Sequence, residues 1–115
     1  MSLADQTCVP CRGGVPPMEL AKAQETLKEL GSGWQLTHSG KRLERAYAFK
    51  NFLEAMAFAN RLADVAEAQG HHPDIHISWG QARVETWTHK IDGLTESDFY
   101  LAAKADRAYT QTQAA

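Results

Sequence analysis

The sequence has no long apolar run, no excess of positive charge and only two cysteines. Its 12 Lys and Arg residues and 14 Asp and Glu residues give a formal net charge of −2. This charge argues against non-specific binding of nucleic acid, which relies on a positive field. No apolar stretch reaches the roughly 18 residues that a membrane-spanning helix needs. Residues 1–6 lack the basic start and apolar core of a secretory signal, so we expect a cytoplasmic protein.

The two cysteines, Cys8 and Cys11, form a CxxC pair in a segment rich in proline and glycine. One interpretation is half of a zinc site, but no second CxxC follows at zinc-finger spacing. The other is a redox pair, but such a pair normally lies between a strand and a helix. We therefore expect a reduced thiol pair without a known purpose, in an extended leader over residues 1–16. A single domain would follow over residues 17–115.

Apolar periodicity and capping residues predict three helices. The first covers residues 17–30. The second begins after Asn51, and Gly70 suits the left-handed position that ends it. The third runs from about Glu96 to Thr110, and residues 111–115 should fray. The expected core-facing stripe of the second helix is Phe52, Met56, Ala59, Leu62, Ala63 and Ala66.

Alternating apolar and polar residues predict four strands in two hairpins, over residues 34–38 with 41–49 and residues 75–79 with 83–89. The order is then α-β-β-α-β-β-α. This order predicts an α+β domain with a four-stranded antiparallel sheet covered on one face by helices. The uncovered face and edges of such a sheet favour homo-oligomerisation.

Three histidines follow or end predicted elements: His71 and His72 at the exit of the second helix, and His89 at the end of the last strand. Glu67 lies one helical turn before His71, and Asp98 opens the last helix. Imidazoles transfer protons well near neutral pH. The pattern therefore predicts a small proton-transfer enzyme in which the three rings line one cleft.

Two alternatives remain for these histidines. Each ring, taken singly, is explained by a favourable position at a helix end or on the surface. Three imidazoles also suit a zinc hydrolase, and His72 and His76 have the spacing of helical ligands. Pro73 between them argues against a helix there, which weakens the zinc interpretation without removing it.

Several motifs together resemble the pterin-4a-carbinolamine dehydratase family: Glu67-x-x-x-His71-His72-Pro73, Thr88-His89 and Gly93-Leu94-Thr95-x-x-Asp98. The resemblance extends through the rest of the chain, including Gly33-Trp34. It implies removal of water from a 4a-hydroxytetrahydropterin to give the quinonoid dihydropterin, without a metal or cofactor. It also implies a homodimer or homotetramer and a functional link to an aromatic amino acid hydroxylase. A binding, assembly or transcriptional-cofactor protein on the same scaffold is the alternative.

The resemblance also implies which residues form the site. His71 and His89 would carry out the two proton transfers, in an order left open, and His72 would mainly hold the pterin. The implied catalytic residues are His71, His72, His89 and Asp98, and the implied substrate-binding residues are His72, Glu67, Pro73 and Trp34.

Three supporting contacts are implied as well. Asp98 would orient His89 and raise its basicity, or would only cap the last helix. Glu67 would lie near His71. Trp34 would line the pocket, with a position in the core or at an interface as the alternative.

Overall fold

The computed structural model describes residues 2–9 and 15–114. Its helices and strands follow the predicted order α-β-β-α-β-β-α, with two short 3₁₀ turns added. In chain order the elements are η1 (Leu3–Asp5), α1 (Leu20–Leu27), β1 (Gln35–Thr37), β2 (Arg42–Ala48), α2 (Phe52–Gln69), β3 (Asp74–Ser78), β4 (Gln81–Thr86), η2 (His89–Ile91) and α3 (Glu96–Ala114).

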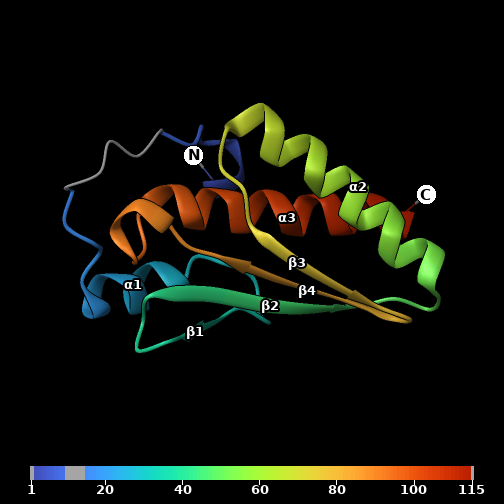
Figure 1. Ribbon diagram of the computed structural model, residues 1–115, viewed down its shortest axis with the longest axis horizontal. Coiled ribbons are helices and arrows are strands. Elements are labelled where there is room, and N and C mark those ends of the chain that lie inside the picture. The colour runs from blue at the N-terminus through green and yellow to red at the C-terminus, as the bar shows by residue number, and fades with distance from the viewer. Residues whose placement is uncertain (1, 10–14, 115) are drawn as a thin grey trace.

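The four strands form one antiparallel sheet in the order β1-β2-β4-β3, so that β2 and β4 lie at its centre. The helices α2 and α3 lie side by side on one face of this sheet (Figure 1). The predicted α+β class and the helix-covered sheet are therefore confirmed. No helix in the described ranges is long and apolar enough to cross a membrane.

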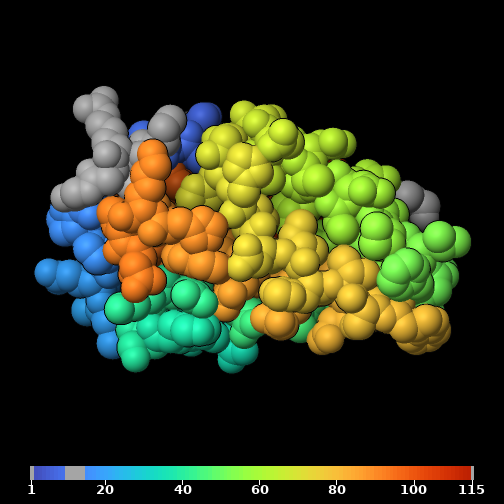
Figure 2. Space-filling model, viewed as in Figure 1, coloured from blue at the N-terminus to red at the C-terminus, as the bar shows by residue number. Residues whose placement is uncertain are grey.

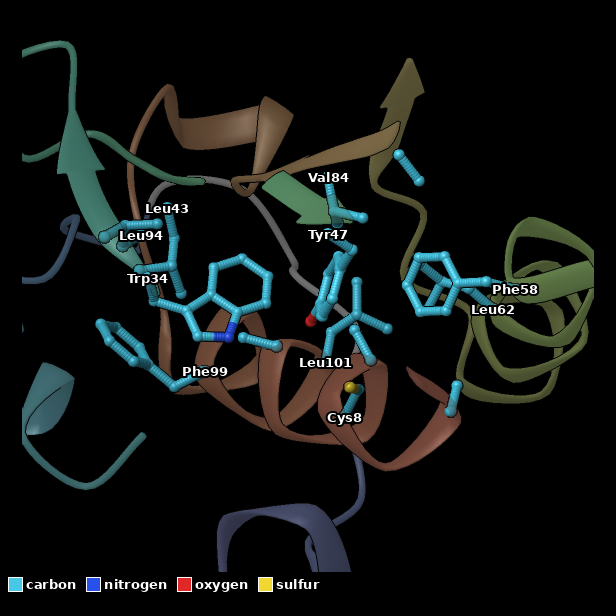
Figure 3. Packing of buried hydrophobic residues seen from close by; sticks show 14 of the residues in the cluster. Cys8, Trp34, Leu43, Tyr47, Phe58, Leu62, Val84, Leu94, Phe99 and Leu101 are labelled. Carbon is cyan, nitrogen blue, oxygen red and sulfur yellow. The ribbon is translucent and has the colours of Figure 1, made fainter. Parts of the chain in front are cut away.

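The core fills the space between the sheet and its two covering helices (Figure 3). Tyr47 of β2 and Val84 of β4 meet Phe58 of α2 and Leu101 of α3, and all four are at most 1% exposed. The rings of Tyr47 and Phe58 lie 4.6 Å apart. Because side chains alternate along a strand, the opposite face of the sheet carries the polar residues. The apolar side chains, whose burial is the main driving force of folding, therefore lie between the sheet and the helices α2 and α3.

The ends of α2 match the prediction, but its buried face does not. The side-chain amide oxygen Oδ1 of Asn51 accepts from the Glu54 N–H at 2.8 Å, and Gly70 ends the helix at φ 65°. The residues that α2 buries are Ala55, Phe58, Leu62 and Ala66. Phe52, placed in the core by the prediction, is 47% exposed. The helix offers two adjacent apolar stripes, and packing against the sheet and α3 selects between them.

Two other helices differ from the prediction in length. α1 begins only at Leu20 because the preceding chain is tied elsewhere: the Met18 N–H donates to the Leu94 carbonyl at 2.8 Å. Beyond Leu27 the chain continues in tighter i→i+3 turns rather than as an α-helix. α3 extends to Ala114 instead of fraying after Thr110, and the buried Thr112 anchors this last turn.

The strand predicted over residues 83–89 is also shorter. β4 ends at Thr86, and the Thr88 N–H donates to the Gly93 carbonyl at 2.8 Å to close a loop. His89 therefore opens the 3₁₀ turn η2 instead of ending a strand.

The leader residue Cys8 is buried against α3, and burial raises the pKa of its thiol. Such a thiol behaves as a small apolar group rather than as a nucleophile. Cys11 lies outside the described residues, so the predicted thiol pair stays a prediction.

Candidate active site

His71, His72 and His89 line one pocket of about 270 Å³, together with Gly70, Trp87, Thr88 and Lys90. Two segments build the pocket: the chain that leaves α2, and the chain that runs from β4 into η2. Figure 2 shows the yellow surface of the first segment adjoining the orange surface of the second. The structure thus brings the three predicted imidazoles together.

The exit of α2 presents two of these rings because the helix ends sharply. Gly70 takes the left-handed conformation that is strained for other residues, and the His71 N–H still bonds to the Ala66 carbonyl at 3.2 Å. Pro73 then leads the chain into β3, and it is half-buried and does not line the pocket. Gly70 and Pro73 therefore redirect the chain at the end of α2, and both imidazoles lie at this bend.

Asp98 forms the buried centre of the site. It is fully buried in the first turn of α3, and its Oδ1 lies 2.6 Å from Nε2 of His71. The Thr86 hydroxyl donates to Oδ1 at 2.8 Å, and the Thr88 hydroxyl donates to Oδ2 at 2.9 Å. Oδ2 also accepts the Thr95 N–H at 3.0 Å. These four donors match the acceptor capacity of an ionised carboxylate, so the side chain is held rigidly.

The expected contact between Asp98 and His89 is therefore corrected, because Asp98 bonds to His71. Thr86 and Thr88 are two residues apart on an extended chain and share the side that faces Asp98. His89 follows on the opposite side. The capping role of Asp98 is present as well, since it accepts the N–H of Thr95 just before α3.

Glu67 is expected near His71, and the hydrogen-bond partner that the structure gives it is His72. Glu67 Oε2 and His72 Nε2 form a hydrogen bond, and the two side chains are 77% and 59% exposed. The left-handed turn at Gly70 brings His72 back toward the last turn of α2. An exposed pair of this kind adds little to stability, but it orients the His72 ring at the pocket mouth.

The ring of His89 is supported by Trp87, a residue that the sequence analysis missed. The two ring centroids lie 4.1 Å apart with the planes nearly perpendicular, an edge-to-face arrangement. The Arg42 guanidinium carbon lies 4.0 Å from the Trp87 centroid, within the range of a cation–π contact. The sequence signal that could have indicated this role is the aromatic residue two positions before His89. Trp79, by contrast, is 71% exposed at the β3–β4 turn.

Trp34 does not join the pocket. It is 7% exposed within the core, where its ring N–H donates to Asp106 Oδ1 at 3.0 Å. The alternative of a core position for Trp34 is therefore the one that the structure supports. Tyr47 donates to the same Asp106 oxygen at 2.6 Å, so this carboxylate ties the sheet to α3.

The donor geometry does not favour a metal site. Within residues 2–9 and 15–114, no group of three or more His, Cys, Asp or Glu side chains is arranged to hold a metal ion. His76, the potential partner of His72, is exposed on β3 opposite Arg83.

Comparison with known proteins shows the family of this chain. The model of the family described as pterin 4 alpha carbinolamine dehydratase matches residues 16–108. The chain belongs to this family. A Rickettsia bellii protein, which carries the name pterin-4-alpha-carbinolamine dehydratase provisionally, is 53% identical over 105 residues. That match covers 91% of this chain and 92% of the Rickettsia protein.

Two solved structures have a similar fold. The crystal structure of a transcriptional coactivator/pterin dehydratase from Brucella melitensis has a TM-score of 0.75 and 29% identity, covering 80% of this chain and 97% of that one. A pterin dehydratase-like protein identified as a RuBisCO assembly factor in the alpha-carboxysome has a TM-score of 0.58 and 22% identity, covering 67% and 89%. This second likeness concerns the fold alone.

Proposed function

We propose that this protein removes water from a 4a-hydroxytetrahydropterin to give the quinonoid dihydropterin. The observation that carries the proposal is one pocket lined by three imidazoles, one of them bonded to the buried Asp98. In the reaction the C4a–O bond breaks, and the departing oxygen takes up a proton and leaves as water. The adjacent ring nitrogen loses a proton as the C=N bond forms. One acid and one base near neutral pH meet both needs.

The contacts of His71 suit the base. Because Asp98 accepts the Nε2–H of His71, Nδ1 is the ring nitrogen left to take a proton from the pterin. The carboxylate stabilises the imidazolium that forms, as an orienting aspartate does in other acid–base sites. His89, on the other segment of the pocket, then supplies the proton to the departing hydroxyl. His72, oriented by Glu67, holds the pterin.

A coupled assay tests the proposal. An aromatic amino acid hydroxylase turning over a tetrahydropterin generates the 4a-carbinolamine, and its decay is followed by absorbance. Adding the purified protein should accelerate this decay at catalytic concentrations, both before and after dialysis against a chelator. Decay at the rate of the uncatalysed reaction would overturn the proposal. Loss of the activity after dialysis would overturn the metal-free acid–base mechanism.

We also propose a homodimer or homotetramer as the working form of the enzyme. β1 and β3 are the edge strands of the sheet, and exposed edges invite pairing with another chain. Light scattering coupled to size-exclusion chromatography should give a mass of two or four times 12.7 kDa. A mass of one chain at all concentrations would overturn this part.

A further inference from the structure

We infer that Gln69 and Ser97 are positioning residues, which align the His71–Asp98 pair by binding residues 8–9 of the leader between them. The inference rests on the proposed function only for its effect on rate, because the alignment itself can be measured without a substrate. The family model matches residues 16–108, so the leader contributes from outside the matched stretch.

Four hydrogen bonds attach the leader to the two helix ends. The Cys8 N–H donates to Gln69 Oε1, and the Val9 N–H donates to the Ser97 hydroxyl oxygen, both at 2.8 Å. The Ser97 hydroxyl donates in turn to the Val9 carbonyl at 3.3 Å, and the Cys8 thiol donates to the Ser97 carbonyl at 3.5 Å. Cys8 and Ser97 are 5% and 4% exposed. The leader is therefore a packed part of this junction.

The two anchoring residues stand next to the catalytic pair in the chain. Gln69 is the last residue of α2, two positions before His71, and Ser97 directly precedes Asp98 in the first turn of α3. The leader thus bridges the end of the helix that presents the imidazole and the start of the helix that presents the carboxylate. Figure 1 shows this N-terminal segment, in dark blue, lying against α3 beside the chain that leaves α2.

This bridge matters because the pair depends on the alignment of two separate elements. His71 lies beyond the end of α2, where its N–H is bonded back to the Ala66 carbonyl of the helix. Its 2.6 Å hydrogen bond to Asp98 crosses to α3, so relative movement of the two helix ends lengthens it. Misplacement of a catalytic group by about 1 Å can reduce a rate on the order of 100-fold.

Matched variants in the full chain separate positioning from folding. Gln69→Met keeps the length of the side chain and removes the acceptor, while Gln69→Glu keeps an acceptor oxygen for the Cys8 N–H. Ser97→Ala removes the hydroxyl bonded to Val9. Arg107→Gln is the control, because it loses a different leader contact, to Asp5 at 2.9 Å, on the same helix.

The decisive readout is solvent exchange of the His71 ring N–H, measured by NMR without a substrate. In Gln69→Met and Ser97→Ala we expect exchange about tenfold faster, as for the loss of about one hydrogen bond. Gln69→Glu and Arg107→Gln should keep the wild-type rate. Unchanged exchange in the first two variants, or equal acceleration in Arg107→Gln, would overturn the inference.

The coupled assay then reports on catalysis. In Gln69→Met and Ser97→Ala we expect kcat about tenfold lower with KM nearly unchanged, because the pterin contacts stay in place. If the wild-type protein has no dehydratase activity, the proposed function fails, and the exchange measurement still decides whether the leader positions the pair.

Discussion

Oδ1 of Asp98 lies 2.6 Å from Nε2 of His71, across 27 residues of sequence, and Asp98 is fully buried. The carboxylate comes from the first turn of α3 and the imidazole from the exit of α2. A buried carboxylate with its acceptor sites filled is rigid, so it fixes both the ring orientation and the tautomer of His71. The acid–base chemistry proposed for this pocket depends on that relationship.

Asp98→Asn should lower both activity and stability. In the wild-type protein, several donors point at the carboxylate oxygens, and the amide would place an N–H group beside some of them. The substitution also removes the negative charge that stabilises the His71 imidazolium. We expect kcat to fall on the order of 100-fold or more and unfolding free energy to fall by about 1–3 kcal/mol. The coupled assay and urea unfolding measure these effects. Glu96→Gln, two residues earlier on the exposed side of the same turn, should change neither; equal losses in both variants would contradict the account.

Trp87→Leu should impair the pocket without unfolding the protein. The substitution removes the ring that contacts His89 at 4.1 Å and the surface on which Arg42 lies. We expect kcat/KM to fall about tenfold, since an aromatic contact contributes about 0.5–1.5 kcal/mol. Trp79→Leu, which replaces a tryptophan that is 71% exposed, serves as the control. A similar kinetic effect of both substitutions would argue against a specific role for Trp87.

Glu67→Gln should affect substrate binding more than stability. Its pair with His72 is exposed, so the unfolding free energy should change by less than about 0.5 kcal/mol. If the pair orients His72 toward the pterin, KM should rise several-fold while kcat changes little. Asp64→Asn, an exposed acid one turn earlier on α2, should leave KM unchanged. A loss confined to kcat would instead place Glu67 in the chemical step.

Because Tyr47 is buried beside Asp106, we expect the free energy of unfolding to fall at alkaline pH. Burial, and then the charge of Asp106, raise the pKa of Tyr47 above its ordinary value. The folded protein therefore keeps the phenol proton that the unfolded chain releases above about pH 10. Stability should fall as the pH rises further, by up to about 1.4 kcal/mol per pH unit from this group.

Tyr47→Phe tests that dependence. At neutral pH it should cost about 1 kcal/mol, because the hydrogen bond to Asp106 is lost. Between about pH 10 and 11 its stability should fall less steeply than that of the wild type. Urea unfolding at a series of pH values measures both slopes, and parallel slopes would contradict the assignment.

The order of the elements could be predicted because each carries its own local signal. Asn51 and Gly70 mark both ends of α2, and Thr95 with Asp98 marks the start of α3. The buried face of α2 could not be predicted in the same way. Phe52 and Ala55 head two neighbouring apolar stripes, and only the tertiary contacts of the helix decide which one is buried.

The candidate site shows the same division between local and long-range information. Gly70 and Pro73 place His71 and His72 at one helix exit, which the sequence makes plain. The partners of the two rings depend on where distant segments meet. The strand β4 ends at Thr86, before His89, and Asp98 bonds to His71. This contact joins two segments that are far apart in the sequence, so no local pattern could predict it.

The most direct test of the central claim compares His71→Ala, His89→Ala and His76→Ala in the coupled assay. His71 and His89 line the pocket, whereas His76 lies exposed on β3. The account predicts that the first two variants lose on the order of 100-fold or more of the acceleration of 4a-carbinolamine breakdown, and that His76→Ala keeps the wild-type rate. Wild-type rates in His71→Ala and His89→Ala would contradict it.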